Sequence, residues 1–311
     1  MTEQLSHHGV LSPVVTPFDE DLRPDIAQLA AQCRWLLSND VGLALFGTNS
    51  EATSLGLDER CEILDGLVQA GIPVSRMMPG TGTCSIADTV KLTNRAVKHG
   101  CPGVLMLPPF YYKGMSDDGL FAYFSEVIER VGDANLRIYL YHIPPVSQVP
   151  LSMALIEKLL KAYPKIIAGV KDSGGQWDNT QAMITAFGKD GFDVFAGSET
   201  FLLQTMQAGG KGCISATANV NPAAISHLYK TWTAADADAQ QAALTATREI
   251  FQSYPMIPAL KAAVAQHSGV EGWATVRPPL VALNDTQRQN LAAGLQAAGF
   301  RMPGLKETAD A

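Results

Sequence analysis

The chain has 311 residues, of which 47% are hydrophobic and 17% are charged, and its formal net charge is −7. This length can bury a sizeable core and fits one large α/β domain with an appendage, or two domains. The acidic balance offers no basic patch for nucleic acid, and no stretch approaches the ~18 apolar residues of a membrane span. Because no signal peptide is recognisable either, we expect a cytoplasmic protein with no nucleic-acid or membrane partner.

Cysteine and histidine usage indicates neither a disulfide framework nor a metal site. The five cysteines are widely spaced and form no C-x-x-C pair, so we expect buried free thiols in a reducing compartment. His7 and His8 lie in a polar segment without other metal ligands nearby, which predicts local disorder there.

Apolar runs alternate with segments of helical periodicity along the first two thirds of the chain. The runs are far enough apart for one strand and one helix each, and eight such units predict a (β/α)8 TIM barrel. The predicted strands are Gly9–Val15, Gly42–Phe46, Val74–Met78, Gly103–Leu107, Arg137–Tyr141, Ile166–Lys171, Phe192–Ala196 and Gly212–Ser215. An open doubly wound sheet is the alternative, although Gly80-Thr81-Gly82 lacks the third glycine of a dinucleotide-binding motif.

Capping residues mark several predicted helices. Asp25 is the predicted N-cap of a helix with an apolar stripe, and Ser85-x-x-Asp88 resembles a capping box. After the eighth run, Asn221-Pro222 predicts the start of a further helix. We therefore expect residues 1–222 to form the barrel and residues 223–311 to form a C-terminal helical extension.

One predicted strand ends in an amine. The run Ile166–Lys171 is apolar until its last residue, and the Ser-Gly-Gly that soon follows predicts a turn. A lysine amine in water has a pKa of ~10.4, and an apolar pocket can lower that pKa until the amine attacks a carbonyl carbon and forms a Schiff base. Lys171 is therefore a candidate nucleophile, and a surface lysine just past a strand is the ordinary alternative.

Small and polar residues follow the other predicted strands. Barrels of this kind place their chemistry at the C-terminal ends of the strands. There, Gly47-Thr48-Asn49 could bind a carboxylate through backbone N–H groups and a hydroxyl, or form a common turn. Tyr141 could shuttle protons beside an amine, or be a buried tyrosine with a satisfied hydroxyl. These ends are too poor in carboxylates and histidines for a metal site or a paired-carboxylate glycosidase.

Taken together, motifs along nearly the whole chain resemble the pyruvate-dependent class I aldolases, the family of dihydrodipicolinate synthase and N-acetylneuraminate lyase. The motifs are Val14-Val15-Thr16-Pro17-Phe18, Gly47-Thr48-x-x-Glu51, Pro109-Phe110-Tyr111, Tyr141-x-x-Pro144, Gly169-Val170-Lys171-Asp172-Ser173, Gly197-Ser198-Glu199 and Gly209-Gly210-x-Gly212-x-Ile214-Ser215. The resemblance implies a (β/α)8 barrel with a C-terminal helical extension, a homotetramer built as a dimer of dimers, and no cofactor.

The resemblance also implies catalytic roles. Lys171 would be the Schiff-base lysine, and Tyr141 would relay protons at the bond being made or broken. Thr48 would join Tyr141 in a hydrogen-bonded relay, and Tyr111 would complete that relay from a neighbouring subunit.

Further residues would bind the substrate. Gly47, Thr48 and the backbone of Asn49 would hold the carboxylate of a 2-oxo acid, and Ile214 would lie near it. In the segment that begins at Gly197, Glu199 would reach substrate hydroxyls or, alternatively, start a helix.

Two positions depart from the pattern of dihydrodipicolinate synthases. Val146 stands where those enzymes usually carry an arginine that grips the carboxylate of the aldehyde, so their reaction is disfavoured here. Asn49 replaces the usual threonine, although an asparagine amide can still donate to a carboxylate. The stretch from Tyr141 to Ser147 is more similar to the neuraminate-lyase and sugar-acid aldolase branch.

We therefore predict a Schiff-base lyase that acts on a 2-oxo acid, with pyruvate and an aldehyde, or a 2-oxo-3-deoxy sugar acid, as substrates. Three alternatives remain open. They are a 2-oxo-3-deoxy sugar acid dehydratase, a 4-hydroxy-tetrahydrodipicolinate synthase and a non-catalytic protein that binds an oxo acid.

Overall fold

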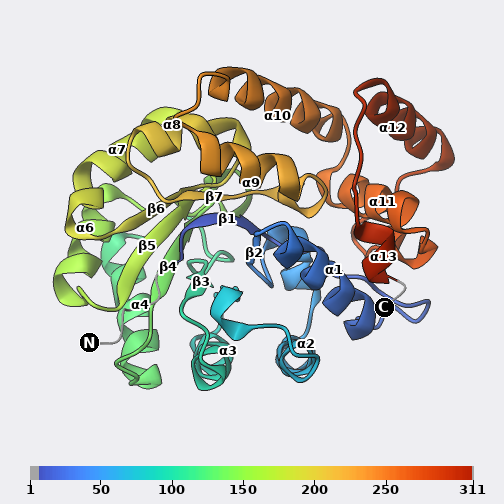
Figure 1. The fold of residues 1–311 in the computed structure, drawn as a ribbon. Coiled ribbons are helices and arrows are strands. Elements are labelled where there is room, and N and C mark those ends of the chain that lie inside the picture. Colours follow the sequence, from blue (N-terminus) through green and yellow to red (C-terminus); the bar gives the residue numbers. More distant parts are fainter. Residues whose placement is uncertain (1–6, 310–311) are drawn as a thin grey trace. The chain divides into compact units, whose positions relative to one another are not determined.

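A computed structural model describes residues 7–309 of the chain. The contacts divide it into two compact units, and Figure 1 labels the helices and strands of both. The first unit comprises the chain up to Gly9 and Pro73–Ile214, and the second comprises Val10–Ile72 and Ser215–Ala311. Within residues 7–309, no helix is long and apolar enough to cross a membrane.

The first unit contains a parallel sheet in the strand order β7-β6-β5-β4-β3. Its strands are β3 (Val104–Met106), β4 (Ile138–His142), β5 (Ile167–Asp172), β6 (Asp193–Ala196) and β7 (Gly212–Ile214). Every residue of β4 is buried, as is all of β5 except half-buried Ala168, because these apolar strands are covered on both faces.

Gly169 allows β5 to pack this closely. A Cβ atom at position 169 would lie 2.2 Å from the backbone oxygen of Asp193 and 2.8 Å from the ring of Tyr139. No other residue fits there without displacing a neighbouring strand.

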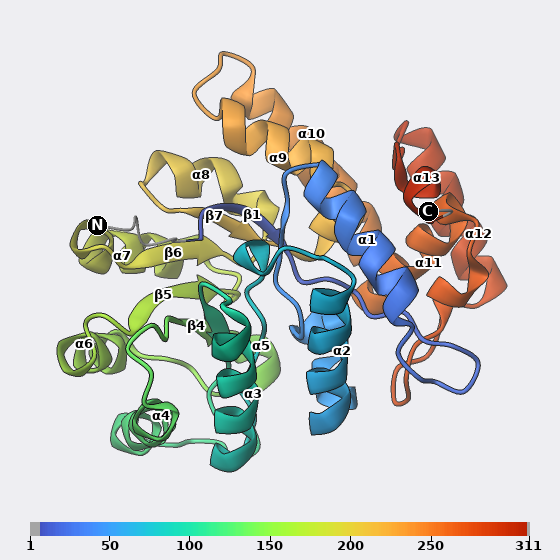
Figure 2. The same ribbon diagram turned by 60° about the horizontal axis from the view of Figure 1, so that its bottom comes forward.

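Helices connect these strands and lie on one side of them (Figure 2). The α-helices are α3 (Ile86–His99), α4 (Asp117–Val131), α5 (Pro144–Ser147), α6 (Met153–Ala162), α7 (Trp177–Phe187) and α8 (Leu202–Gln207), and the 3₁₀ turns are η3 (Val74–Arg76), η4 (Gly188–Asp190) and η5 (Glu199–Phe201). As predicted, Ser85 caps α3, because its hydroxyl accepts a hydrogen bond from the backbone N–H of Asp88.

The strand predicted at Val74–Met78 is wrong. Val74–Arg76 forms the 3₁₀ turn η3, and the N–H of Met77 donates to the oxygen of Val74 instead of to a strand. Pro79 has no N–H to offer a ladder. The chain then makes only an isolated parallel bridge between Gly80 and Leu105. The named strands of the described residues therefore number seven, one fewer than predicted.

His7 is ordered and buried in the first unit, so the disorder predicted for it is also wrong. Its side chain packs edge to face on Tyr139, with 5.8 Å between ring centroids, and its backbone N–H donates to the Tyr139 hydroxyl. That hydroxyl donates in turn to Asp193. Burial lowers the pKa of His7 to about 4 and raises the pKa of Asp193.

The second unit contains the parallel pair β1 (Gly9–Ser12) and β2 (Gly42–Leu43), although Gly9 itself belongs to the first unit. Its α-helices are α1 (Ile26–Ser38), α2 (Leu57–Gln69), α9 (Pro222–Thr231), α10 (Ala237–Gln252), α11 (Met256–Ser268), α12 (Asp285–Ala297) and α13 (Leu305–Ala309). Its 3₁₀ turns are η1 (Thr48–Ser50), η2 (Ala52–Ser54), η6 (Ala216–Asn219) and η7 (Glu271–Ala274).

Predicted helix starts in this unit are confirmed. The carboxylate of Asp25 accepts from the N–H of Gln28 at the start of α1, and Pro222 is the first residue of α9. Segments distant in sequence meet here, because α1 packs against α13 and the indole of Trp35 donates to the backbone oxygen of Pro303 at 2.8 Å.

Four of the five cysteines are buried free thiols, as predicted, and Cys84 is instead exposed.

Candidate active site

Lys171 lies near the carboxyl end of β5, and its side chain is buried. The residue is only 2% exposed. Its Nζ atom donates a hydrogen bond to the hydroxyl of Tyr141 at 3.2 Å and lies 4.2 Å from the centroid of that ring. The alternative of a surface lysine just past a strand is therefore wrong.

The strand register brings this pair together. Tyr141 of β4 is the register partner of Lys171 on β5, and in parallel strands both residues stand near the same edge of the sheet. Tyr141 is 3% exposed, so the amine and the phenol meet where water is largely excluded. Electrostatic and hydrogen-bonding interactions are stronger in such surroundings than in water.

The next register pair, His142 and Asp172, supports the two strand ends. The Asp172 carboxylate accepts hydrogen bonds from the N–H of Gly174, at 2.9 Å, and from the side chains of Asn179 and Thr180, at 3.0 and 2.7 Å. It thereby ties the end of β5 to the first turns of α7. A charged carboxylate with three donors is a strong anchor in a buried place.

His142 adds a second polar contact beside the site. Its Nδ1 atom accepts from the N–H of Leu151 at 3.1 Å, so in the neutral ring the proton lies on Nε2, 3.9 Å from the Asp172 carboxylate. Burial lowers the pKa of His142, and the charge of Asp172 opposes that shift.

Three predicted binding residues also lie in the first unit. Gly197 follows β6, and its N–H donates to the backbone oxygen of Asp172 at 2.7 Å. Glu199 begins the 3₁₀ turn η5 and is 1% exposed, and Ile214, the last residue of β7, is fully buried. Gly197 therefore packs directly on the end of the strand that carries Lys171.

Gly47, Thr48 and Asn49 lie in the second unit, where they form a tight turn. Thr48 and Asn49 are half-buried and begin η1. The N–H of Gly47 donates to the Ser50 hydroxyl at 3.1 Å, and the hydroxyl of Thr16 donates to the Ser50 backbone oxygen at 2.8 Å. These bonds fix the backbone on which the predicted carboxylate site depends.

Tyr111 and Val146 are exposed. The Tyr111 ring is 73% exposed in this chain and packs edge to face on Tyr112, whereas Val146 of α5 is 62% exposed. The side chain of Lys113, between Tyr112 and the start of α4, donates to the backbone oxygen of Ser147 at 2.9 Å. It therefore joins the loop that carries Tyr111 to the end of α5.

The described residues contain no cluster of three or more His, Cys, Asp or Glu side chains that could hold a metal ion.

The fold and the buried pair place this chain in the class of parallel α/β proteins with a candidate active site at the carboxyl ends of the strands. Parallel α/β proteins place their active sites beyond the carboxyl ends of the strands, and a buried amine paired with a phenol lies there in this chain.

The sequence matches the dihydrodipicolinate synthetase family over residues 6–298, and the chain belongs to that family. An uncharacterized DapA-like lyase from Chloroflexus aurantiacus is 30% identical, with 94% of this chain and 96% of that protein covered. The crystal structure of dihydrodipicolinate synthase from Agrobacterium tumefaciens strain C58 is 34% identical and matches with a TM-score of 0.86 over 94% of this chain and 99% of that one.

A second solved structure is that of YagE, a prophage protein of the dihydrodipicolinic acid synthase family from E. coli K12, in complex with pyruvate. It is 28% identical to this chain and matches with a TM-score of 0.85, with 94% of this chain and 99% of that one covered.

Sequence reasoning assigned no role to His142, Asp172 or Glu51. His142 and Asp172 each follow a predicted catalytic residue directly, and Glu51 ends the motif that contains Thr48. A polar residue adjacent to a catalytic residue on a buried strand is the signal that could have identified the first two, because it needs a partner of its own.

Proposed function

We propose that this protein is a class I lyase that forms a Schiff base between Lys171 and a 2-oxo acid, with pyruvate as the substrate or product common to its reactions. Membership of the dihydrodipicolinate synthetase family supports a pyruvate-dependent aldolase-type function. The observation that carries the proposal is the buried contact of 3.2 Å between the Lys171 amine and the Tyr141 hydroxyl.

Imine formation follows from the presence of an amine in a buried site from which water is largely excluded. The neutral amine of Lys171 attacks the C2 carbonyl carbon of the oxo acid, water leaves, and a protonated imine forms. This cation withdraws electrons, so a proton leaves C3 or the C3–C4 bond breaks, and an enamine results. The enamine adds to an aldehyde or takes up a proton, and water then releases the product and the free amine.

The remaining residues bind the substrate and move protons. Tyr141 gives and takes the protons at the substrate, together with Thr48 and with Tyr111 of a neighbouring subunit. Gly47, Thr48 and the backbone of Asn49 hold the substrate carboxylate.

Gly197, Glu199 and Ile214 complete the binding site. Glu199 binds hydroxyl groups of the longer substrate, and Ile214 packs against the oxo acid.

Trapping of the imine tests this proposal. We expect the protein to gain one reduced pyruvyl group in its intact mass after incubation with pyruvate and borohydride, whereas Lys171→Ala should gain none. Lys165→Ala is the matched control, because Lys165 is an exposed lysine six residues earlier and its loss should leave the adduct unchanged. If the wild-type protein gave no adduct with any of a panel of 2-oxo acids, the proposed function would fail and a non-catalytic oxo-acid-binding protein would be favoured.

The side chain at position 146 bears on which substrates the protein accepts. The position is a valine instead of the arginine that would bind the carboxylate of an aldehyde, so we expect poor 4-hydroxy-tetrahydrodipicolinate synthase activity. Release of pyruvate from 3-deoxy-2-oxo sugar acids would identify an aldolase, and a product that keeps all the carbon atoms would identify a dehydratase. Val146→Arg should favour aldehydes that carry a carboxylate.

We also propose that residues 1–222 form a (β/α)8 barrel, in which the parallel bridge of Gly80 to Leu105 stands in the place of the remaining strand, with residues 223–311 as a helical extension. The protein acts as a cytoplasmic homotetramer and needs no metal or organic cofactor.

A further inference from the structure

Glu51 closes the turn that begins at Gly47, and its backbone is unusual. Its φ of 56° is in the left-handed region, which non-glycine residues rarely adopt. Its N–H donates to the Thr48 oxygen at 3.1 Å and so completes η1. This conformation is strained for a residue with a side chain, and it persists only where the surroundings impose it.

The surroundings that impose it lie more than 200 residues further along the chain. One carboxylate oxygen of Glu51 accepts from the ammonium of Lys261 on α11 at 2.7 Å, and the other accepts from the backbone N–H of Arg277 at 2.9 Å. The side chains of Glu51 and Lys261 are both fully buried. Burial lowers the pKa of Lys261 to about 8, and the charge and the hydrogen bond of Glu51 oppose that shift.

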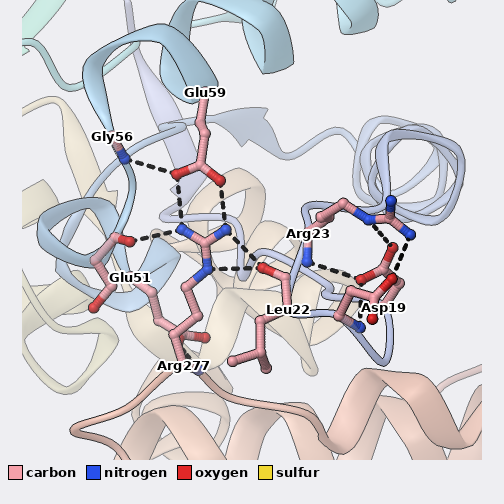
Figure 3. A network of polar contacts seen from close by, with 9 residues as sticks. Asp19, Leu22, Arg23, Glu51, Gly56, Glu59 and Arg277 are labelled. Atoms are coloured by element: carbon pink, nitrogen blue, oxygen red, sulfur yellow. Dashed lines mark hydrogen bonds and ion pairs between the residues drawn. The ribbon is translucent and has the colours of Figure 1, made fainter.

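Arg277 is itself held by several groups (Figure 3). Its guanidinium donates to both carboxylate oxygens of Glu59 and to the backbone oxygens of Leu22 and Ser54. Glu59 also accepts from the N–H of Gly56 at the start of α2, and the hydrogen bonds from Arg277 lower the pKa of the Glu59 carboxyl. The N–H that reaches Glu51 is thus fixed in place.

The turn is therefore fixed from two sides. Thr16 holds the Ser50 oxygen on one side, and Lys261 and Arg277 hold Glu51 on the other. Within the turn only Thr48 and Asn49 are half-buried, since Ser50 and Glu51 are 1% and 2% exposed. Thr48 and Asn49 are the residues to which the proposed function assigns the substrate carboxylate.

We propose that Glu51 and Lys261 are positioning residues: their buried ion pair holds the turn of Gly47 to Glu51 in the form that binds the carboxylate of the 2-oxo acid, so that α11 governs affinity for that acid. The inference rests on the proposed function. A buried ion pair is often no more stabilising than well-packed apolar side chains of the same volume, so stability alone is a weak reason for it. Holding the turn in its binding geometry gives the ion pair of Glu51 and Lys261 a role in function.

The test compares affinity with turnover. Lys261→Met keeps the unbranched side chain up to its last atom and removes the ammonium group, and Glu51→Gln is the milder variant should Lys261→Met fail to fold. We expect the pyruvate concentration that half-saturates borohydride trapping, and KM, to rise about tenfold or more, with kcat at saturating substrate changed by less than about threefold. Lys261→Arg, which restores the charge, should recover part of the affinity.

Trp35→Phe is the matched control for simple destabilisation. It removes the indole hydrogen bond to Pro303 in the same unit and leaves the contacts of Glu51 with Lys261 and Arg277 in place. We expect it to lower the midpoint of urea unfolding while the half-saturating pyruvate concentration stays within about twofold.

The outcomes separate this inference from the proposed function. If wild type is trapped and the Lys261→Met and Glu51→Gln variants keep its half-saturating concentration, the inference is wrong and the proposed function stands. It is equally wrong if Trp35→Phe, at the same loss of stability, weakens pyruvate binding as much as Lys261→Met does. If wild type gives no adduct at all, the proposed function fails and this inference fails with it.

Discussion

At the scale of single residues, the contact between Lys171 and Tyr141 is the centre of the proposed chemistry. The tyrosine hydroxyl lies 3.2 Å from the amine, and both side chains are buried. Proton transfer by a positioned side chain requires this kind of hydrogen-bonding distance. A phenol at that distance can serve both the formation of the imine and the proton transfer at the substrate carbon.

Tyr141→Phe tests that role. The variant keeps the ring and removes the hydroxyl, so we expect kcat to fall about 10²- to 10⁴-fold, the usual contribution of a general acid–base group. The amine remains, so slow trapping with pyruvate and borohydride should persist. Steady-state kinetics and intact mass measure the two effects. A kcat within about threefold of wild type would exclude Tyr141 as the proton relay.

A functional polar residue could be identified from the sequence where its neighbours in the chain make it conspicuous, and not where its role depends on a distant partner. Lys171 and Tyr141 stand at the ends of apolar runs, where a polar residue is conspicuous, and the structure pairs them. Lys261 gives no such signal, because its partner Glu51 is 210 residues away and only the folded chain brings the two together. Lys261 lies in a helical segment, where a lysine is ordinarily solvated.

At the scale of elements, the loop after β6 packs tightly on the end of β5. A Cβ atom at position 197 would lie 2.1 Å from the Ser173 hydroxyl oxygen and 2.7 Å from the backbone oxygen of Asp172. These are the two residues that follow Lys171 in the chain. Gly197 therefore has a packing reason to be glycine, in addition to its proposed place in the substrate site.

Gly197→Ala should displace the end of β5. We expect a loss of about 2 kcal/mol or more in the free energy of unfolding, since the clash involves backbone as well as side chain, together with a lower kcat. Gly188→Ala is the matched control, because its φ is −62° and its Cβ would lie 3.7 Å from the nearest atom. Urea unfolding should place the control within about 0.5 kcal/mol of wild type. Equal stability of the two variants would contradict the packing argument.

Sequence patterns predicted the elements well where apolar runs are pure. The predicted strands around β4, β5 and β6 agree with the structure to within one residue at each end. The run at Val74–Met78 is less pure, because it contains Ser75 and Arg76, and the turn at Val74–Arg76 uses its N–H groups locally. Hydrophobicity specifies that a segment is buried, and the availability of its N–H groups decides whether it pairs.

At the scale of the whole molecule, buried His7 links the start of the chain to the stability of the first unit. Its folded-state pKa is about 4, below the ordinary value of 6.5. Between these pH values the unfolded chain binds a proton that the folded chain does not, so stability is lost as pH falls from 6.5 towards 4. The loss amounts to about 3 kcal/mol when complete.

His7→Phe should remove this acid sensitivity. Phenylalanine can keep the edge-to-face contact with Tyr139 and has no proton to bind. We expect the urea midpoint of the variant to fall less than that of wild type between pH 7 and pH 4, and His8→Gln, at an exposed neighbour, should keep the wild-type dependence. Parallel pH curves for His7→Phe and wild type would contradict the assignment.

The position of Tyr111 bears on how subunits assemble. Its ring is 73% exposed in the single chain and packs on the neighbouring ring of Tyr112. A patch of exposed aromatic side chains is typical of a surface that contacts another protein chain. If Tyr111 serves the active site of a neighbouring subunit, Tyr111→Phe and Lys171→Ala are each defective, but each supplies what the other lacks. When equal amounts of the two variants pair at random, half of the dimers contain one subunit of each. Each of these mixed dimers has one intact site out of two. Co-expressed subunits should therefore regain about a quarter of wild-type kcat. Recovery should be absent when the separately purified variants are mixed without subunit exchange. If co-expression restored nothing, Tyr111 would act within its own chain or not at all.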